Sequence, residues 1–313
     1  MQKHIPGMCF LWILLFTLVN GTGCGTTNSV YRIGKETAKE VSDKLLPGAK
    51  PILKKKVLLT PVMNLANVKD EKVPQLTETL LGLLEKDDSL LITLSTGLAP
   101  SREKMRSPQF GVIIDPELVQ KAVEMGMNVL ITCVLHPLEE ETKTSGIWPF
   151  HRVKREVVLS MSLNAVDTTS GTLLLNRIET RRLKRRGDGS ESQDGPLEID
   201  DETLSEELSS ILEDLSSAVL DTLNDQYWSG LLEMTSGGYI KINGGKDIGI
   251  KDGSVFEVYG KKDSIRSVSG KSYYFLGPKD GEIRVEKTME DYSLAVPLDN
   301  KHFENGQILR LKR

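Results

Sequence analysis

Cys24 is the residue best placed to do chemistry in this sequence, because of the segment that precedes it. Lys3 and His4 form a short polar start, Cys9–Val19 is a predominantly apolar run, and Asn20–Gly23 is a stretch of small residues. A membrane-spanning helix needs about 20 apolar residues, whereas this run has 11. We therefore interpret the segment as a cleaved export signal that ends at a cysteine thiol.

This arrangement resembles the signal of bacterial lipoproteins, which are cut before a cysteine that then carries the lipid. The resemblance implies that Cys24 becomes an acylated, palmitate-bearing N-terminus, and two or more acyl chains anchor a protein stably. The family usually has an aliphatic residue where this chain has Gly21. An ordinary secreted protein cut near Gly23 is therefore the alternative. Gly25, in place of an aspartate that retains lipoproteins in the inner membrane, implies the outer membrane, with the chain facing the periplasm.

The other residue types that commonly do chemistry are scattered. His136, His151 and His302 follow neither the H-x-x-x-H nor the H-E-x-x-H pattern, so we expect no metal site. Cys133 lies inside an apolar run, which favours a buried thiol over a reactive one. No nucleophile–base pair or phosphate-binding loop stands out. We therefore expect no enzymatic activity, no cofactor and no small-molecule substrate.

Two surface features could contact partners. Ile147, Trp148 and Phe150 lie in a loop between polar flanks, which favours a partner or membrane-interface contact, unless the loop folds onto its own core. A basic strand end precedes an acidic stretch, which favours either an acidic partner or charge compensation within the chain. Its candidate contact residues are Arg181, Arg182, Arg185 and Arg186.

The composition is that of a soluble globular protein, with 39% apolar and 27% charged residues among 313. A chain of this length favours two domains. Loss of the signal removes Lys3, so that 39 of the 40 basic residues remain against 44 acidic ones, a formal charge of −5. This charge balance argues against nucleic-acid binding.

The first half alternates strand and helix patterns, which predicts a mixed-sheet α/β sandwich of the α+β or α/β class. Asp115 and Pro116 supply the capping residue and first-turn proline of one helix. The predicted elements are strands at Val57–Val62, Leu90–Leu94, Asn128–Leu135, Arg155–Val166 and Thr172–Leu183, and helices at Pro74–Glu85, Asp115–Met125 and Asp201–Asp225.

Glycine becomes dense beyond residue 228, and the strand patterns become short, which predicts a small all-β barrel. Its predicted strands are Tyr239–Ile242, Ser254–Tyr259, Gly281–Glu286, Tyr292–Pro297 and Ile308–Lys312. The chain thus divides into a signal peptide (1–23), a lipidated N-terminus and tether (24–50), an α/β sandwich (51–228) with a disordered-type insertion (187–196), and a barrel (236–313).

Both predicted domains resemble known families. Residues 56–225, through Val57–Val62, Glu124–Ile131 and Leu163–Gly171, resemble the periplasmic α/β domain of curli-secretion-type lipoproteins, the TolB N-terminal domain and peptidoglycan-synthase-activating lipoproteins. Residues 236–313, through Gly249–Tyr259 and Asn305–Leu309, resemble the C-terminal domain of the flagellar assembly protein T family.

The resemblances imply a non-enzymatic outer-membrane lipoprotein that acts as a structural or assembly factor of an envelope machine, of flagellar basal-body or secretion type. Its partners would be an envelope complex or further copies of itself. One alternative is a curli-type secretion channel, although the candidate membrane insertions Thr96–Ile114 and Glu139–Arg155 are short and charged. The other is an activator of a peptidoglycan synthase, although the tether is short for crossing the wall.

Overall fold

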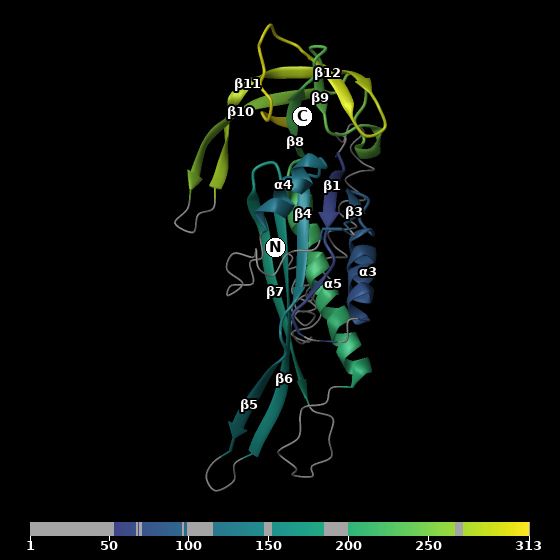
Figure 1. Ribbon diagram of the computed structural model, residues 1–313, viewed down its shortest axis with the longest axis vertical. Coiled ribbons are helices and arrows are strands. Elements are labelled where there is room, and N and C mark those ends of the chain that lie inside the picture. The colour runs from purple at the N-terminus through teal and green to yellow at the C-terminus, as the bar shows by residue number, and fades with distance from the viewer. Residues whose placement is uncertain are drawn as a thin grey trace, which may run out of the picture. The chain divides into compact units, whose positions relative to one another are not determined.

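A seven-stranded mixed sheet and a closed six-stranded barrel make up the part of the chain that the structure describes (Figure 1). The computed structural model describes residues 53–66, 68, 71–95, 97–98, 115–146, 152–184, 200–266 and 272–312. The predicted fold class, a mixed α/β sheet followed by a small barrel, is confirmed. Residues 52–313 form one compact unit.

The sheet has the order β3-β1-β4-β6-β5, with β2 beside β4 and β7 beside β6. Its strands are β1 (Lys55–Leu59), β2 (Met63–Asn64), β3 (Leu90–Leu94), β4 (Val129–Leu135), β5 (Glu139–Ser145), β6 (Arg152–Asp167) and β7 (Thr172–Lys184). β1 pairs in parallel with β3 and β4, whereas β4, β5 and β7 all pair with β6 in antiparallel fashion. β1 and β4 are buried along their whole length, which explains the predominantly apolar sequence of β4, whereas β1 also buries Lys55 and Lys56.

Helices cover the two faces of the sheet. α3 (Lys72–Leu84) and α5 (Asp201–Asp225) share the larger core cluster with alternate residues of β4 and β6. α4 (Pro116–Glu124) packs on the opposite face, where Leu118 and Ala122 contact Leu58 and Leu130. Asp115 caps α4 as the sequence predicts, because its carboxylate accepts a hydrogen bond from the backbone N–H of Glu117.

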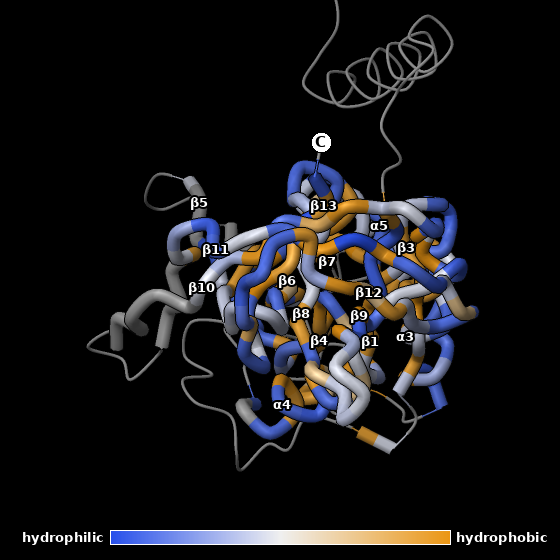
Figure 2. Tube along the Cα trace, turned by 90° about the horizontal axis from the view of Figure 1, so that it is seen from above, coloured by the Kyte–Doolittle hydropathy of each residue, from blue (hydrophilic) through white to orange (hydrophobic). Residues whose placement is uncertain are grey.

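The barrel closes in the order β10-β11-β12-β9-β8-β13, and all of its pairs are antiparallel. Its strands are β8 (Ser229–Met234), β9 (Ile240–Ile242), β10 (Val255–Arg266), β11 (Ser272–Thr288), β12 (Ser293–Pro297) and β13 (Ile308–Leu311), with a short 3-10 turn at Lys246–Ile248. Phe256 fills the barrel core against Trp228, with ring centroids 5.6 Å apart. Figure 2 shows apolar residues along the interior strands and hydrophilic ones toward the periphery.

Three features of the fold go beyond the sequence-based prediction. β8 belongs to the barrel although it precedes residue 236, where the predicted barrel begins. β5 forms from the sequence EEETKTS, which has no apolar residue and is held by its pairing with β6. β10 and β11 continue past the predicted strand ends to form a long two-stranded arm (Figure 1).

Candidate functional site at the junction of sheet and barrel

The chain enters the sheet through the barrel. Leu53 belongs to the apolar core of the barrel, and only two residues later β1 begins. Between them, the backbone N–H of Lys54 donates to the carbonyl oxygen of Ile248 in the 3-10 turn at 3.0 Å. The first strand of the sheet is therefore fastened to the barrel at its N-terminal end.

Lys56 makes the second link between the two substructures. Its Nζ lies 2.8 Å from Oδ2 of Asp247 and donates to the carbonyl oxygen of Asp291 at 3.0 Å. The two side chains are only 10% and 17% exposed. A buried ion pair contributes little net stability against its desolvation cost, but removal of one partner strands the other charge, so such a pair fixes geometry.

Asn128, the residue before β4, makes the third link. Its Oδ1 accepts a hydrogen bond from the backbone N–H of Lys56 at 2.8 Å, and its Nδ2 donates to the carbonyl oxygen of Ser229 at 2.7 Å. The residue is 7% exposed. One amide side chain therefore satisfies buried backbone groups of β1 and β8 at once.

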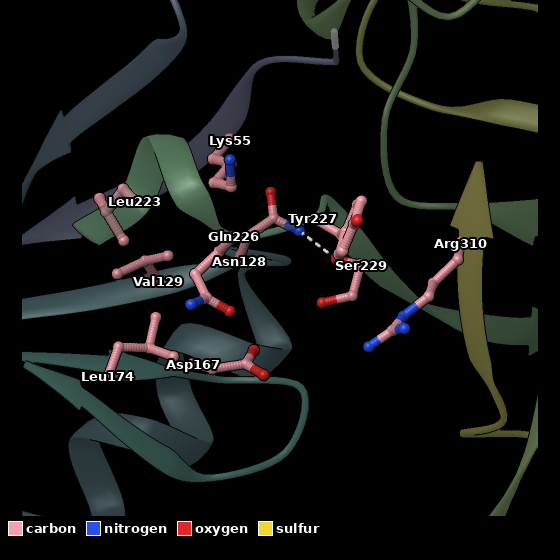
Figure 3. Close-up of a pocket in the computed structure, with 10 residues that line it drawn as sticks. All are labelled: Lys55, Asn128, Val129, Asp167, Leu174, Leu223, Gln226, Tyr227, Ser229 and Arg310. Atoms are coloured by element: carbon pink, nitrogen blue, oxygen red, sulfur yellow. Dashed lines mark hydrogen bonds between the residues drawn. The ribbon is translucent and has the colours of Figure 1, made fainter. Parts of the chain in front are cut away.

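A pocket of about 70 Å³ opens beside these links. Figure 3 shows its lining, which includes Lys55 of β1, Asp167 at the end of β6, Gln226 after α5 and Arg310 of β13. A water molecule needs roughly 10–15 Å³ of such a cavity. The space therefore suits a few waters or one small polar group, not a whole metabolite.

Burial perturbs two charged groups of the pocket. Burial lowers the pKa of Lys55, and the nearby charge of Asp87 opposes the shift. Burial raises the pKa of Asp167, although its carboxylate accepts hydrogen bonds from the Ser170 hydroxyl and the backbone N–H of Thr169. Both directions have the same cause, because the low-dielectric interior disfavours whichever form is charged.

The chemistry that this arrangement supports is recognition. The pocket offers a guanidinium, an ammonium, a carboxylate, amide groups and the hydroxyls of Tyr227 and Ser229. Among the described residues, no group of three or more histidine, cysteine, aspartate or glutamate side chains could hold a metal ion. In the same part of the chain, no helix is both long and apolar enough to cross a membrane.

Most of the contact residues singled out in the sequence lie outside the described residues, namely Cys24, Ile147, Trp148, Phe150, Arg185 and Arg186. Their proposed roles stay predictions. The signal peptide, the tether and the 187–196 insertion also lie outside this part of the chain.

Two of the predicted basic contacts are described, and both form ion pairs within the chain. Arg181 pairs with Asp214 of α5 and lies 3.8 Å from Glu207, whereas Nε of Arg182 lies 3.2 Å from Glu141 of β5. The hydrogen bond from Arg182 holds the pKa of Glu141 below its usual value. Neither arginine lines the junction pocket.

The buried state of Cys133 is confirmed. The thiol is inaccessible within β4, and burial raises its pKa to about 12. A thiol in this environment is almost entirely protonated at neutral pH, and it is therefore a poor nucleophile and metal ligand.

Sequence reasoning missed the junction and its pocket. Arg310 stands in the short strand ILRL, and Asn128 stands immediately before an apolar strand. The one signal in the sequence was a polar residue directly before a buried strand. Such a residue lies beside buried backbone groups, which need hydrogen-bond partners.

No protein-family model matches this chain, and no curated protein matches it. Solved structures with low similarity include the lipoprotein GNA1162 of Neisseria meningitidis, at 15% identity and a TM-score of 0.26, over 55% of this chain and 99% of that one. The PelC dodecamer of Paraburkholderia phytofirmans shares 12% identity with a TM-score of 0.32, over 57% and 95% of the two chains. TolB of Acinetobacter baumannii shares 8% identity with a TM-score of 0.28, over 82% and 61%. Bacterial lipoproteins and TolB are thus among the structures to which this chain is similar.

Proposed function

We propose that this chain is a non-enzymatic lipoprotein of the bacterial cell envelope, anchored to the outer membrane through Cys24 and facing the periplasm. Its work is to hold other components in place as a structural or assembly factor. The N-terminal sequence supports the anchoring, because an 11-residue apolar run followed by small residues ends directly at this cysteine.

The observation that carries the scaffold role is the buried linkage of sheet and barrel. Lys54, Lys56 and Asn128 each bond across the junction, and all three bonds are made from within a few residues of β1 or β4. Domains joined by a small polar interface usually move relative to one another. Here the links are at least partly buried and hydrogen-bonded, which favours a fixed arrangement of sheet and barrel that can hold partners on both substructures.

The finer assignment follows from the resemblances of the two sequence halves. We propose an envelope machine of the flagellar basal-body or secretion type, with a protein complex or further copies of this chain as partners. The Arg181–Asp214 and Arg182–Glu141 ion pairs are partly exposed at the surface, so exchange of these acidic groups for a partner's would cost little.

The anchoring is tested in a Gram-negative host by metabolic labelling with a palmitate analogue, followed by separation of the two membranes. The wild-type chain is expected to carry the label in the outer membrane, and Cys24→Ala is expected to lose it. Cys133→Ala is the matched control, because its buried thiol is no acylation site, and it should label like the wild type. Label on Cys24→Ala, or none on the wild type, would refute the lipid anchor.

The scaffold role is tested separately by photo-crosslinking in cells, with the photoreactive residue placed at Ile147, Trp148 or Arg182. Crosslinks to a small, reproducible set of envelope proteins or to a second copy are expected. A probe at Asp299, an exposed barrel position, controls for random collisions. A chain that remains uncrosslinked and monomeric at every probe position would contradict the proposal.

A further inference from the structure

Arg310 is held in an unusual position on the pocket wall. Its guanidinium carbon lies 5.8 Å from the ring centre of Tyr227 and 5.9 Å from that of Tyr259. Its Nε is buried without a hydrogen-bond acceptor. Aromatic faces attract a guanidinium and fix its plane, but they do not satisfy its N–H donors.

The carboxylate nearest in the barrel register is already engaged. Glu257 stands opposite Arg310 in the β10–β13 pair, yet it accepts the Tyr259 hydroxyl at 2.7 Å and the Lys279 ammonium at 2.7 Å. Within the described part of the chain, no carboxylate forms an ion pair with Arg310. The Tyr259–Glu257 bond also orients the ring of Tyr259, which lies within cation–π distance of Arg310. The guanidinium therefore has aromatic neighbours but no ion-pair partner among the described residues.

The pocket in front of Arg310 has the charge and size for one small anionic group. Figure 3 shows the guanidinium of Arg310 and the carboxylate of Asp167 pointing into the same space. Lys55 and Arg310 supply two positive charges to the lining, and Asp167 supplies one negative charge. Asp167 is occupied by its own turn, through Thr169 and Ser170, and its oxygens retain the capacity to accept a further N–H.

We propose that this pocket binds a carboxylate from a peptide chain, seated on the guanidinium of Arg310, and that a C-terminal residue is the preferred source. Such a residue presents its carboxylate and, a few bonds away, its backbone N–H. The planar fork of arginine matches a carboxylate bidentately. Asp167 accepts the N–H, which explains why an acidic group lies in a pocket that is otherwise cationic.

This inference goes beyond the scaffold role, because it names the chemistry that one docking site recognises. It does not depend on lipid anchoring, and its test contains no membrane. A failed peptide titration would therefore leave the Cys24 experiment untouched, and loss of the anchor would leave the pocket unchanged.

The test is a titration of the isotope-labelled, full-length processed chain, followed by nuclear magnetic resonance. The Nε–H signal of Arg310 is recorded together with the side-chain amide signals of Asn128 and Gln226, which line the pocket and remain in every variant. The Arg310 signal is assigned from its loss in Arg310→Lys. Three peptides are compared: N-acetyl-trialanine with a free C-terminus, the same peptide amidated, and amidated N-acetyl-Ala-Asp-Ala. The free acid is expected to shift the Arg310 signal saturably, and its amide is not.

Variants report whether the guanidinium is responsible. Arg310→Gln is expected to weaken binding of the free acid by about tenfold or more, the usual effect of a lost charged hydrogen bond. Arg284→Gln, at an exposed arginine of β11, is the matched control and should bind as the wild type does. If Arg310→Gln does not fold, Arg310→Lys serves instead, because it keeps the charge without the fork and should bind more weakly than the wild type.

The outcomes separate the sources of the carboxylate. Binding of the free acid alone supports a C-terminus, and binding of the internal aspartate peptide as well supports recognition of carboxylates in general. Equal responses to the free acid and its amide, or free-acid binding that is unchanged in both Arg310 variants, would overturn the proposal.

Discussion

Lys55 and Lys56 carry charges that folded proteins seldom bury, and they lie, with the partly buried Asp167, where the sheet meets the barrel. A different set of partners offsets the desolvation of each charge. Lys56 has an ion pair and a carbonyl acceptor, Asp167 has two donors in its own turn, and Lys55 has the distant charge of Asp87. Burial is the largest cause of the pKa shifts of Lys55 and Asp167, because the partners of these two groups do not fully offset their low-dielectric surroundings.

Asp167→Asn tests the cost of this buried carboxylate. The folded-state pKa is raised above the unfolded value, so the stabilising contribution is present at low pH and is lost as pH rises through the folded pKa. Asparagine keeps an acceptor for Thr169 and removes the charge. We expect Asp167→Asn to be more stable relative to wild type at pH 7 than at pH 3.5, measured by urea unfolding.

Asp299→Asn is the control for loss of an acidic charge at an exposed position. A stability difference for Asp167→Asn that does not change between pH 7 and pH 3.5 would contradict the assigned burial.

At the scale of elements, the turn between α4 and β4 determines how closely the sheet approaches the barrel. Gly126 ends this helix with φ +72°, a conformation that non-glycine residues rarely adopt. A Cβ at this position would overlap the side chain of Asn243 in the barrel. Glycine is therefore required at this position for two reasons: the positive φ of the turn and the close approach of the Asn243 side chain.

Gly126→Ala is expected to lower the free energy of unfolding by about 2 kcal/mol, because the left-handed conformation alone costs roughly 1–2 kcal/mol. Gly97→Ala is the matched control, since nothing lies within 4 Å of its Cβ position and its φ is not positive; its effect should stay within about 0.5 kcal/mol. Urea unfolding measures both. Adding Asn243→Ala to Gly126→Ala should recover the part due to overlap and leave the backbone part.

The β10–β11 pair contains register irregularities that redirect its strands. The register of the pair shifts three times, between Val258 and Tyr259, between Tyr259 and Lys261, and between Lys262 and Ser264. Bulges increase local twist and redirect a strand. These shifts lie where the two strands leave the closed barrel. The first part of the β10–β11 hairpin therefore belongs to the barrel, and the rest of it forms the arm.

At the scale of the whole molecule, the junction predicts that sheet and barrel unfold together. The helices lie in the sheet-containing part, and Trp228 lies in the barrel core, so circular dichroism and tryptophan fluorescence report on different substructures. In a Trp148→Phe background the two urea transitions are expected to coincide. Two separate midpoints would contradict a single unit.

Asn128→Ala removes the amide that bonds β1 and β8. We expect it to cost about 1–3 kcal/mol, because it leaves a buried backbone N–H of Lys56 without an acceptor. Asn224→Ala, which removes exposed hydrogen bonds to Ser89 and Asp87, is the matched control and should cost less than about 1 kcal/mol. Equal losses in the two variants would mean that the junction bond contributes nothing special.

The sequence by itself determined what depends on near neighbours along the chain. The alternation over Arg155–Val166 predicts the buried face of β6, Asp115 and Pro116 predict the start of α4, and the apolar stripe of Asp201–Asp225 predicts α5 with its observed bounds. Cys133 is buried because it stands in an uninterrupted apolar strand. Caps and periodicities act over one turn or one pleat, so they can be read before the fold is known.

Only the tertiary structure decided the rest. β5 has no apolar residue and exists through its pairing with β6. Asn128 meets partners 72 and 101 residues away, and Arg310 meets Tyr227, which precedes β8, and Tyr259 of β10. No local pattern encodes such meetings, because they follow from how all the strands pair at once. The candidate site is made of these long-range contacts, and so are the strand pairings of the sheet and the barrel, whereas caps and apolar periodicities are local.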